Sequence, residues 1–180
     1  MLFWRIGAIL FLFRWIFGDP KVDVRFLAAG VVLPDIIDLL IGTVVFGDRF
    51  SSGEIYAHTL LAPTVVAVVI LFLTRRGRRR RAWMALIVAW FFHQLLDGMW
   101  ATTETFLWPF FGLDFPRGPD PYWADLWSRA ASDPWRWVTE VIGLAYLVWL
   151  WFAAGLDSPE RRAQFFSDGR LPRIEEREPA

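Results

Sequence analysis

Ionisable residues at helical spacing interrupt the hydrophobic stretches of this chain. Asp35 and Asp38 lie three residues apart in one apolar stretch. His93 and Asp97 lie four apart in another, and His58 opens a third; the chain has 2 histidines in all. Residues three or four apart share one face of a helix, so each pair presents two side chains together. An ionisable group inside a membrane costs on the order of 3 kcal/mol or more, so such residues usually face the protein interior and serve a function.

Imidazole and carboxylate groups together are ligands for Zn, Mn, Fe or Ni, and three carboxylates can bridge two ions. The chain has no cysteine, which excludes thiolate ligands and disulfides from its chemistry. The sequence therefore predicts a site for a divalent metal ion at Asp35, Asp38, His58, His93 and Asp97. The competing interpretation is a structural polar network, in which these side chains pair with one another to hold the helices together.

The elements that must position these residues are membrane helices. Of 180 residues 56% are hydrophobic and 12 are Trp, while the net charge is +0, which gives no argument for nucleic-acid binding. A spanning helix needs about 20 apolar residues. The predicted fold is all-α, a polytopic membrane bundle of four to five transmembrane helices. The expected spans are residues 26–46, 57–74, 82–100 and 136–156, and residues 2–17 either span or lie in the interface.

The basic run Arg75–Arg81 sets the predicted orientation, because Lys and Arg accumulate in cytoplasmic loops. Residues 1–157 are expected to form one transmembrane domain of the plasma (inner) membrane, with membrane lipids as partners. Residues 158–180 are expected to be a polar, disordered cytoplasmic tail. Residues 101–134 form the expected outer loop, which is long enough to fold over the membrane surface.

Helix geometry places the five polar side chains at one level. At about 1.5 Å rise per residue, all of them lie about 15 to 25 Å above the cytoplasmic ends of their segments, in the outer half of the membrane. Glu140, in the last span, lies at about 24 Å by the same arithmetic. Pro34 is expected to bend its helix beside Asp35, as prolines do where membrane helices line a cavity. The sequence thus predicts that helices of opposite direction bring their polar groups together.

The order of these motifs resembles that of the LexA-regulated, membrane-bound metal-dependent hydrolases, a family of small inner-membrane proteins. The similar pieces are LPDIID at Leu33–Asp38, AHTLL at Ala57–Leu61, HQLLD at His93–Asp97 and WPFF at Trp108–Phe111. The resemblance implies a metal site at the five polar residues, with hydrolysis as the chemistry. Many members carry further histidines, whereas here none precedes His58 and Leu39 follows the second acid. Glu54, Glu140 or water would then fill the vacant positions.

The hydrolase hypothesis has the metal activate water against an ester or phosphoester of a lipid or lipid-linked substrate. Glu140, or an aspartate such as Asp97 that is not a ligand, would act as the general base. Glu140 has a simpler interpretation as well, because an acid near the positive end of a helix dipole needs no catalytic reason. Two other functions stay open: a metal or proton transport component, and a catalytically silent membrane protein.

Overall fold

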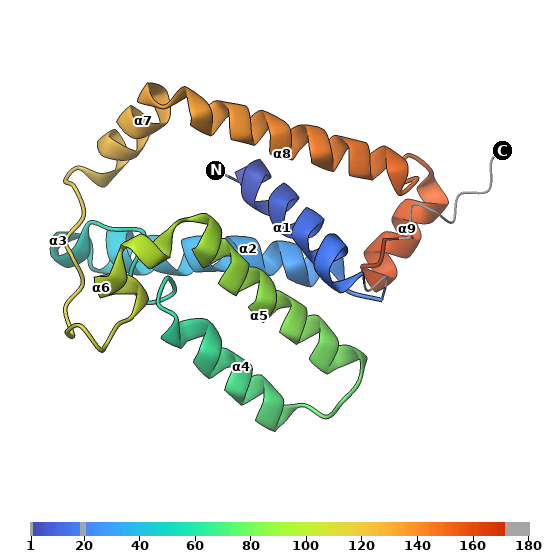
Figure 1. Cartoon of the computed structure of the whole chain (residues 1–180), viewed down its shortest axis with the longest axis horizontal. Coiled ribbons are helices and arrows are strands. Elements are labelled where there is room, and N and C mark those ends of the chain that lie inside the picture. The colour runs from blue at the N-terminus through green and yellow to red at the C-terminus, as the bar shows by residue number, and fades with distance from the viewer. Residues whose placement is uncertain (1, 19–20, 172–180) are drawn as a thin grey trace.

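The computed structural model describes residues 2–18 and 21–171, and these residues form helices and connections with no strand. The all-α prediction is confirmed for this part of the chain. In chain order (Figure 1) the elements are α1 (Leu2–Phe17), α2 (Val24–Leu39), the π-helix η1 (Leu40–Val45), α3 (Gly47–Phe50), α4 (Leu61–Leu73), α5 (Arg78–Leu96), the 3₁₀-helix η2 (Met99–Ala101), α6 (Thr103–Phe106), α7 (Tyr122–Ser132), α8 (Pro134–Ala153) and α9 (Pro159–Asp168).

Within the described residues, two helical segments are long and apolar enough to cross a membrane. They are Val24–Val45, which joins α2 to η1, and Pro134–Ala153, which is α8. These correspond to the spans expected at 26–46 and 136–156. Of the others, α1 has 16 residues, α5 begins inside the basic run, and α4 has 13 residues, about 20 Å of helix. A bundle of four to five spans therefore stays a prediction.

The span expected at residues 57–74 begins later than the sequence indicated. Residues 57–60 form an irregular connection, and α4 starts only at Leu61. The physical reason is that several backbone groups of this connection are bonded to buried side chains of α2 and α5, described below, and these bonds replace the regular hydrogen bonds of a helix. Irregular backbone at membrane depth is tolerated where protein satisfies it in this way. We call residues 51–60 the histidine loop, because it carries His58.

The helices pack in two pairs that share one core. In Figure 1, α2 lies beside α5 and α1 lies beside α8, with α1 also in contact with α2 and α5. Helix α4 packs on α5, which follows it in the chain. Glycines permit the close approach of each pair. A methyl group on Gly30 would overlap the carbonyl oxygen of Leu86 in α5, and one on Gly143 would overlap the backbone of Phe3 in α1. Small residues at crossings are how membrane helices pack closely without a hydrophobic driving force.

The polar segment after residue 157 differs from the expected disordered tail. Residues Pro159–Asp168 form α9, which begins with the Ser158 side chain accepting a hydrogen bond from the Arg161 N–H and ends at Gly169 in the left-handed conformation. Leu171 is buried in the core shared by α1, α2 and α5. A capped start, a glycine stop and one apolar anchor thus order a segment that composition alone classed as disordered. Residues 172–180 of that tail lie outside the described residues.

The C-terminal segment lies at the same end of the molecule as the basic run. The Arg78 guanidinium donates to the Asp168 carbonyl oxygen at 3.1 Å, and the Gly169 carbonyl accepts from the Val24 N–H at 2.7 Å. The start of α2, the start of α5 and the end of α9 therefore meet at one end. The expected orientation requires this arrangement, since it places all three on the cytoplasmic side.

Candidate metal centre

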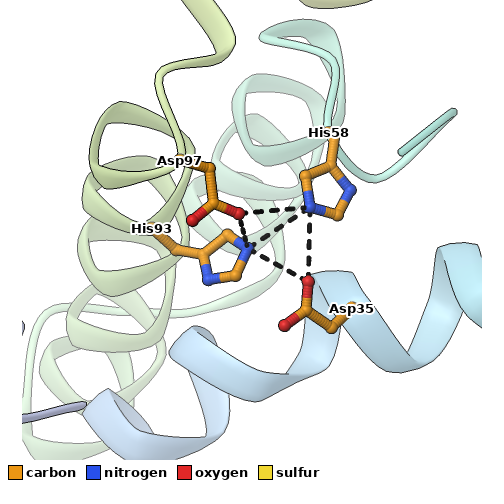
Figure 2. Close-up of side chains that lie close together, drawn as sticks. All are labelled: Asp35, His58, His93 and Asp97. Atoms are coloured by element: carbon orange, nitrogen blue, oxygen red, sulfur yellow. Dashed lines mark hydrogen bonds and ion pairs between the residues drawn. The ribbon is translucent and has the colours of Figure 1, made fainter. Parts of the chain in front are cut away.

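Four of the predicted side chains converge on one point (Figure 2). Asp35 comes from the second half of α2, His58 from the histidine loop, His93 from the last turn of α5, and Asp97 from the residue that follows α5. One ligand atom from each lies within 4.8 Å of the others. Both imidazoles are fully buried, and 6% of the Asp97 side chain is exposed against 43% of the Asp35 side chain. The group is therefore closed except on the side of Asp35.

Most of the distances between the ligand atoms are close to those around a tetrahedral ion. The two Nε2 atoms are 3.3 Å apart, and each lies 3.4 Å from Asp35 Oδ1. Asp97 Oδ2 is 3.2 Å from His93 Nε2 and 3.9 Å from His58 Nε2. Four ligands bound about 2.0 to 2.2 Å from a tetrahedral zinc ion would be about 3.3 to 3.6 Å apart. Four of these five distances lie within about 0.1 Å of that range.

Asp38, the fifth residue predicted as a ligand, is not in this group. Its fully buried carboxylate accepts hydrogen bonds from the backbone N–H groups of Ile55 at 2.7 Å, Ala57 at 2.8 Å and His58 at 3.0 Å. Asp38 Oδ2 also lies 2.7 Å from His58 Nδ1. A carboxylate has no donor, so Nδ1 carries the proton and Nε2 keeps its lone pair for a ligand. Asp38 thus orients the histidine and its loop, as carboxylates do beside metal-binding histidines.

The carbonyl groups of the histidine loop are held from the other side, by α5. Trp90 Nε1 donates to the Ala57 carbonyl at 2.8 Å, and the Gln94 amide donates to the carbonyls of Ala57 at 3.0 Å and Thr59 at 2.9 Å. Residues on both sides of His58 are therefore bonded by buried side chains. The histidine loop is held by α2 through its backbone N–H groups and by α5 through its backbone carbonyls, which fixes the position of the His58 imidazole.

Arg5 of α1 joins the two carboxylates of the group. Its Nη1 lies 2.5 Å from Asp35 Oδ2 and its Nε lies 2.7 Å from Asp97 Oδ1. The guanidinium therefore takes the outer oxygen of each aspartate and leaves the inner one directed at the histidines. A planar guanidinium can hold two carboxylates in fixed orientation in a way that a lysine ammonium cannot.

Charge balance agrees with a divalent cation at this point. Three carboxylates and one guanidinium, with both imidazoles neutral, give the cluster a formal charge of −2. A divalent ion would bring this to zero, which matters because an uncompensated buried charge costs several kcal/mol. Asp97 Oδ2, the atom directed at the centre, is buried and has no hydrogen-bond partner in the described residues. The donor set fits a metal ion, and so does an oxygen that faces both imidazoles without a hydrogen bond.

The structure places Glu140 away from this cluster. Its carboxylate accepts hydrogen bonds from the backbone N–H groups of Phe3 at 2.7 Å and Trp4 at 3.1 Å, at the start of α1. Acids stabilise helix N-termini, because the N–H groups there have no partner within the helix. Glu140 therefore joins α8 to α1. Glu54, the other acid considered for a vacant position, is exposed.

Sequence reasoning missed Arg5, Trp90 and Gln94. Arg5 carried the same signal as the aspartates, a charge within an apolar run, but we considered residues 2–17 only as a span or an interfacial segment and not as part of the site. Several buried carboxylates need a cation nearby, and this requirement would have identified Arg5 as part of the site. Trp90 and Gln94 lie three residues before and one residue after His93. A tryptophan and a glutamine in a membrane helix have no pattern that identifies their carbonyl partners.

One comparison with known proteins supports a membrane location. A family model described as YdjM inner membrane protein matches residues 5–156, a range that contains every residue of the candidate metal centre. No curated protein and no solved structure matches the chain. An inner-membrane family is what the sequence motifs indicated, while hydrolysis and regulation by LexA stay predictions.

Proposed function

The chain belongs to the YdjM inner membrane protein family, and from this we propose that it is a membrane metalloprotein that hydrolyses a lipid or lipid-linked ester. Asp35, His58, His93 and Asp97 would be the ligands of a divalent ion such as Zn, Mn, Fe or Ni. One observation supports this most strongly: four ligand atoms from three separate segments lie within 4.8 Å of one another, inside a membrane protein. Ionisable groups inside a membrane are energetically costly, so a cluster of them is usually retained for a function.

Each residue of the site has a role that follows from its contacts. A divalent ion bound there would supply Lewis acidity, which polarises an ester or phosphoester oxygen and activates water. Asp38 keeps His58 Nε2 directed at the centre, and Arg5 holds the carboxylates of Asp35 and Asp97 in place. Asp97 has one oxygen bonded to Arg5 and the other beside the imidazoles, which favours a ligand role over the general-base role first assigned to it.

Access to the site is on the side of Asp35. This carboxylate is 43% exposed, while the two histidines are fully buried. Water and the reacting group of a substrate would therefore approach along α2. A site set within a helical membrane protein favours an amphiphilic substrate, whose polar group reaches the cluster while its apolar part stays in the lipid. We give Glu140 no part in this chemistry, because its carboxylate is bonded to the start of α1.

The experiment that tests the proposal measures metal content and turnover in the same preparation. The protein is purified into lipid nanodiscs, and bound metal is quantified for the wild type, His93→Ala, Asp97→Asn and the control Glu54→Gln. We expect one tightly bound transition metal per chain in the wild type and in the control, and strong loss in the other two variants. A folded wild type that binds no transition metal would refute the metal site.

Turnover is then measured on a panel of lipid phosphoesters and lipid acyl esters. We expect hydrolysis of at least one class, lost in His93→Ala and retained in Glu54→Gln. If metal is bound but no ester is hydrolysed, the ion is structural and the hydrolase proposal is wrong.

A structural polar network is the second candidate, and Arg5 favours it. Because this guanidinium pairs with both aspartates, the cluster is partly neutralised by the protein itself. The two candidates differ in how the protein responds to metal. A network that is complete without an ion predicts no rise in the unfolding temperature when Zn²⁺ or Mn²⁺ is added, whereas a metal site predicts a rise that depends on concentration.

A further inference from the structure

Helix α7 contains two tryptophans and a leucine, yet none of its residues is buried. Trp123, Leu126, Trp127 and Ala130 follow the spacing i, i+3, i+4, i+7, which places them on one face of the helix. Trp123 is 50% exposed and Trp127 is 70% exposed. Within the described part of the chain, the two tryptophans on the apolar face of α7 are therefore largely uncovered, while Leu126 and Ala130 on the same face are half-buried.

The opposite face of α7 is polar. It carries Asp125, Ser128, Arg129 and Ser132, and Asp125 forms an ion pair with Arg129 one turn later. The helix has 11 residues, about 16 Å, which is too short to cross a bilayer. A short helix with one charged face and one face rich in Trp and Leu is typical of segments that lie in the plane of a membrane surface.

The place of α7 in the fold locates that surface. Asp133 alone separates α7 from α8, one of the two segments long and apolar enough to span. The indole N–H of Trp137 in α8 donates to the Ala130 carbonyl at 2.9 Å, which holds the corner between the two helices. Exposed apolar side chains continue from α7 along α8, at Trp135, Trp137, Val138, Val141 and Ile142. If α8 crosses the membrane, α7 lies within one turn of the boundary.

The far end of α7 contacts the histidine loop. Tyr122 begins the helix and lies against Gly53, where a methyl group would be 2.5 Å from the tyrosine hydroxyl oxygen. Just before α7, the Gly118 N–H donates to the Phe50 carbonyl and the Ser51 hydroxyl donates to the Pro119 carbonyl, both at 2.8 Å. The segment from Gly118 to the end of α7 is therefore attached both to α8 and to the loop that carries His58.

We propose that α7 is an interfacial helix, whose apolar face lies in the headgroup layer of the bilayer at the end where α8 begins. Its partner is the lipid surface itself. The continuity of its exposed tryptophans with the apolar surface of α8 favours lipid over a protein partner, because Trp side chains concentrate at this level of a membrane. The proposal does not depend on metal binding or on hydrolysis. It predicts that residues 101–121 lie at the membrane surface, above the histidine loop.

Single-cysteine labelling tests the proposal, because the chain has no cysteine of its own. Trp127→Cys on the apolar face and Ser128→Cys on the polar face are each labelled with a nitroxide in phosphatidylcholine–phosphatidylglycerol nanodiscs. Collision rates with oxygen, which concentrates in lipid, and with a water-soluble nickel chelate are then measured. Val141→Cys, on the exposed surface of α8, serves as the lipid-facing reference. Monodisperse protein with unchanged helical content is required of each variant.

We expect the label at position 127 to resemble the reference at 141, with frequent oxygen collisions, and the label at 128 to collide mainly with the nickel chelate. Equal access of the chelate to 127 and 128 would show a helix in water and overturn the proposal. Shielding of 127 from both reagents would mean a protein partner or a second copy of the chain, and would overturn it too. A reference at 141 that faces water would remove the continuity on which the inference rests.

Discussion

Replacing Asp38 with asparagine tests whether this residue orients the histidine loop or binds the metal itself. The substitution keeps the shape of the side chain and removes its charge. Asp38 Oδ2 serves three donors, the N–H groups of Ile55 and His58 and the Nδ1 of His58, while Oδ1 serves the N–H of Ala57. An amide has one oxygen, so the NH₂ group of the asparagine must face at least one of these donors.

The expected loss can be worked from these contacts. If the amide oxygen takes the place of Oδ2, the N–H of Ala57 becomes a buried donor without an acceptor, which costs about 1 to 3 kcal/mol. The three remaining bonds lose their charged acceptor, which brings the total to about 3 to 5 kcal/mol, the range measured when one partner of a buried ion pair is removed. Because Nδ1 of His58 loses its carboxylate partner, we expect metal affinity to fall by about 10- to 100-fold.

The assay is a titration with Mn²⁺ or Zn²⁺ in nanodiscs, combined with thermal unfolding of the metal-free protein. Asp48→Asn is the matched control, since Asp48 is exposed and its replacement should change stability by less than about 0.5 kcal/mol. Unchanged affinity in a destabilised Asp38→Asn would refute the orienting role. Complete loss of stoichiometric binding in a folded variant would show that Asp38 is a ligand, as the sequence first predicted.

Three further substitutions probe the cation beside the site, the helix crossing and the start of α2. Arg5→Gln leaves two carboxylates without their cation, so we expect the free energy of unfolding of the metal-free protein to fall by about 3 to 5 kcal/mol. Added Mn²⁺ should then raise the unfolding temperature of this variant more than that of the wild type. An equal rise in both would contradict the charge-balance argument. Gly30→Ala pushes α2 away from α5 and should lower the free energy of unfolding by about 1 to 3 kcal/mol. In the control Gly47→Ala the added methyl group meets no neighbouring atom, so the free energy of unfolding should hardly change. Similar unfolding temperatures for both variants would refute the close crossing of α2 and α5. Burial would raise the pKa of Asp23, but the hydrogen bonds and charge of Arg25 outweigh it and hold that pKa below its usual value. The carboxylate therefore contributes stability above about pH 4, and this stability is lost as the pH falls further. Between pH 5 and pH 3 the unfolding temperature of Asp23→Asn should decrease less than that of the wild type. Identical decreases would exclude this contribution.

Much of the site could be predicted because helical spacing is a local property. The pair of Asp35 and Asp38, and the pair of His93 and Asp97, needed only the 3.6-residue period to share a face, and the rise per residue was enough to place the groups at one level. Those two rules led to a cluster, and four of the five side chains form one. The same rules failed for His58, which was expected within a helix and lies in an irregular loop. Local pattern carries no information about backbone bonds to distant side chains.

The sequence by itself determined that this protein is helical, that it has segments apolar enough to span a membrane, and that histidine and aspartate residues lie within its apolar segments. Only the tertiary structure decided what each acid does. Asp35 and Asp38 are equivalent by spacing, yet Asp35 points to the imidazoles while Asp38 is occupied by three backbone N–H groups and His58. Glu140, which helix arithmetic placed at the same level as the cluster, bonds to the start of α1 instead. The reason is that a carboxylate goes to the donors it meets after packing, and those donors come from segments that are distant in the sequence.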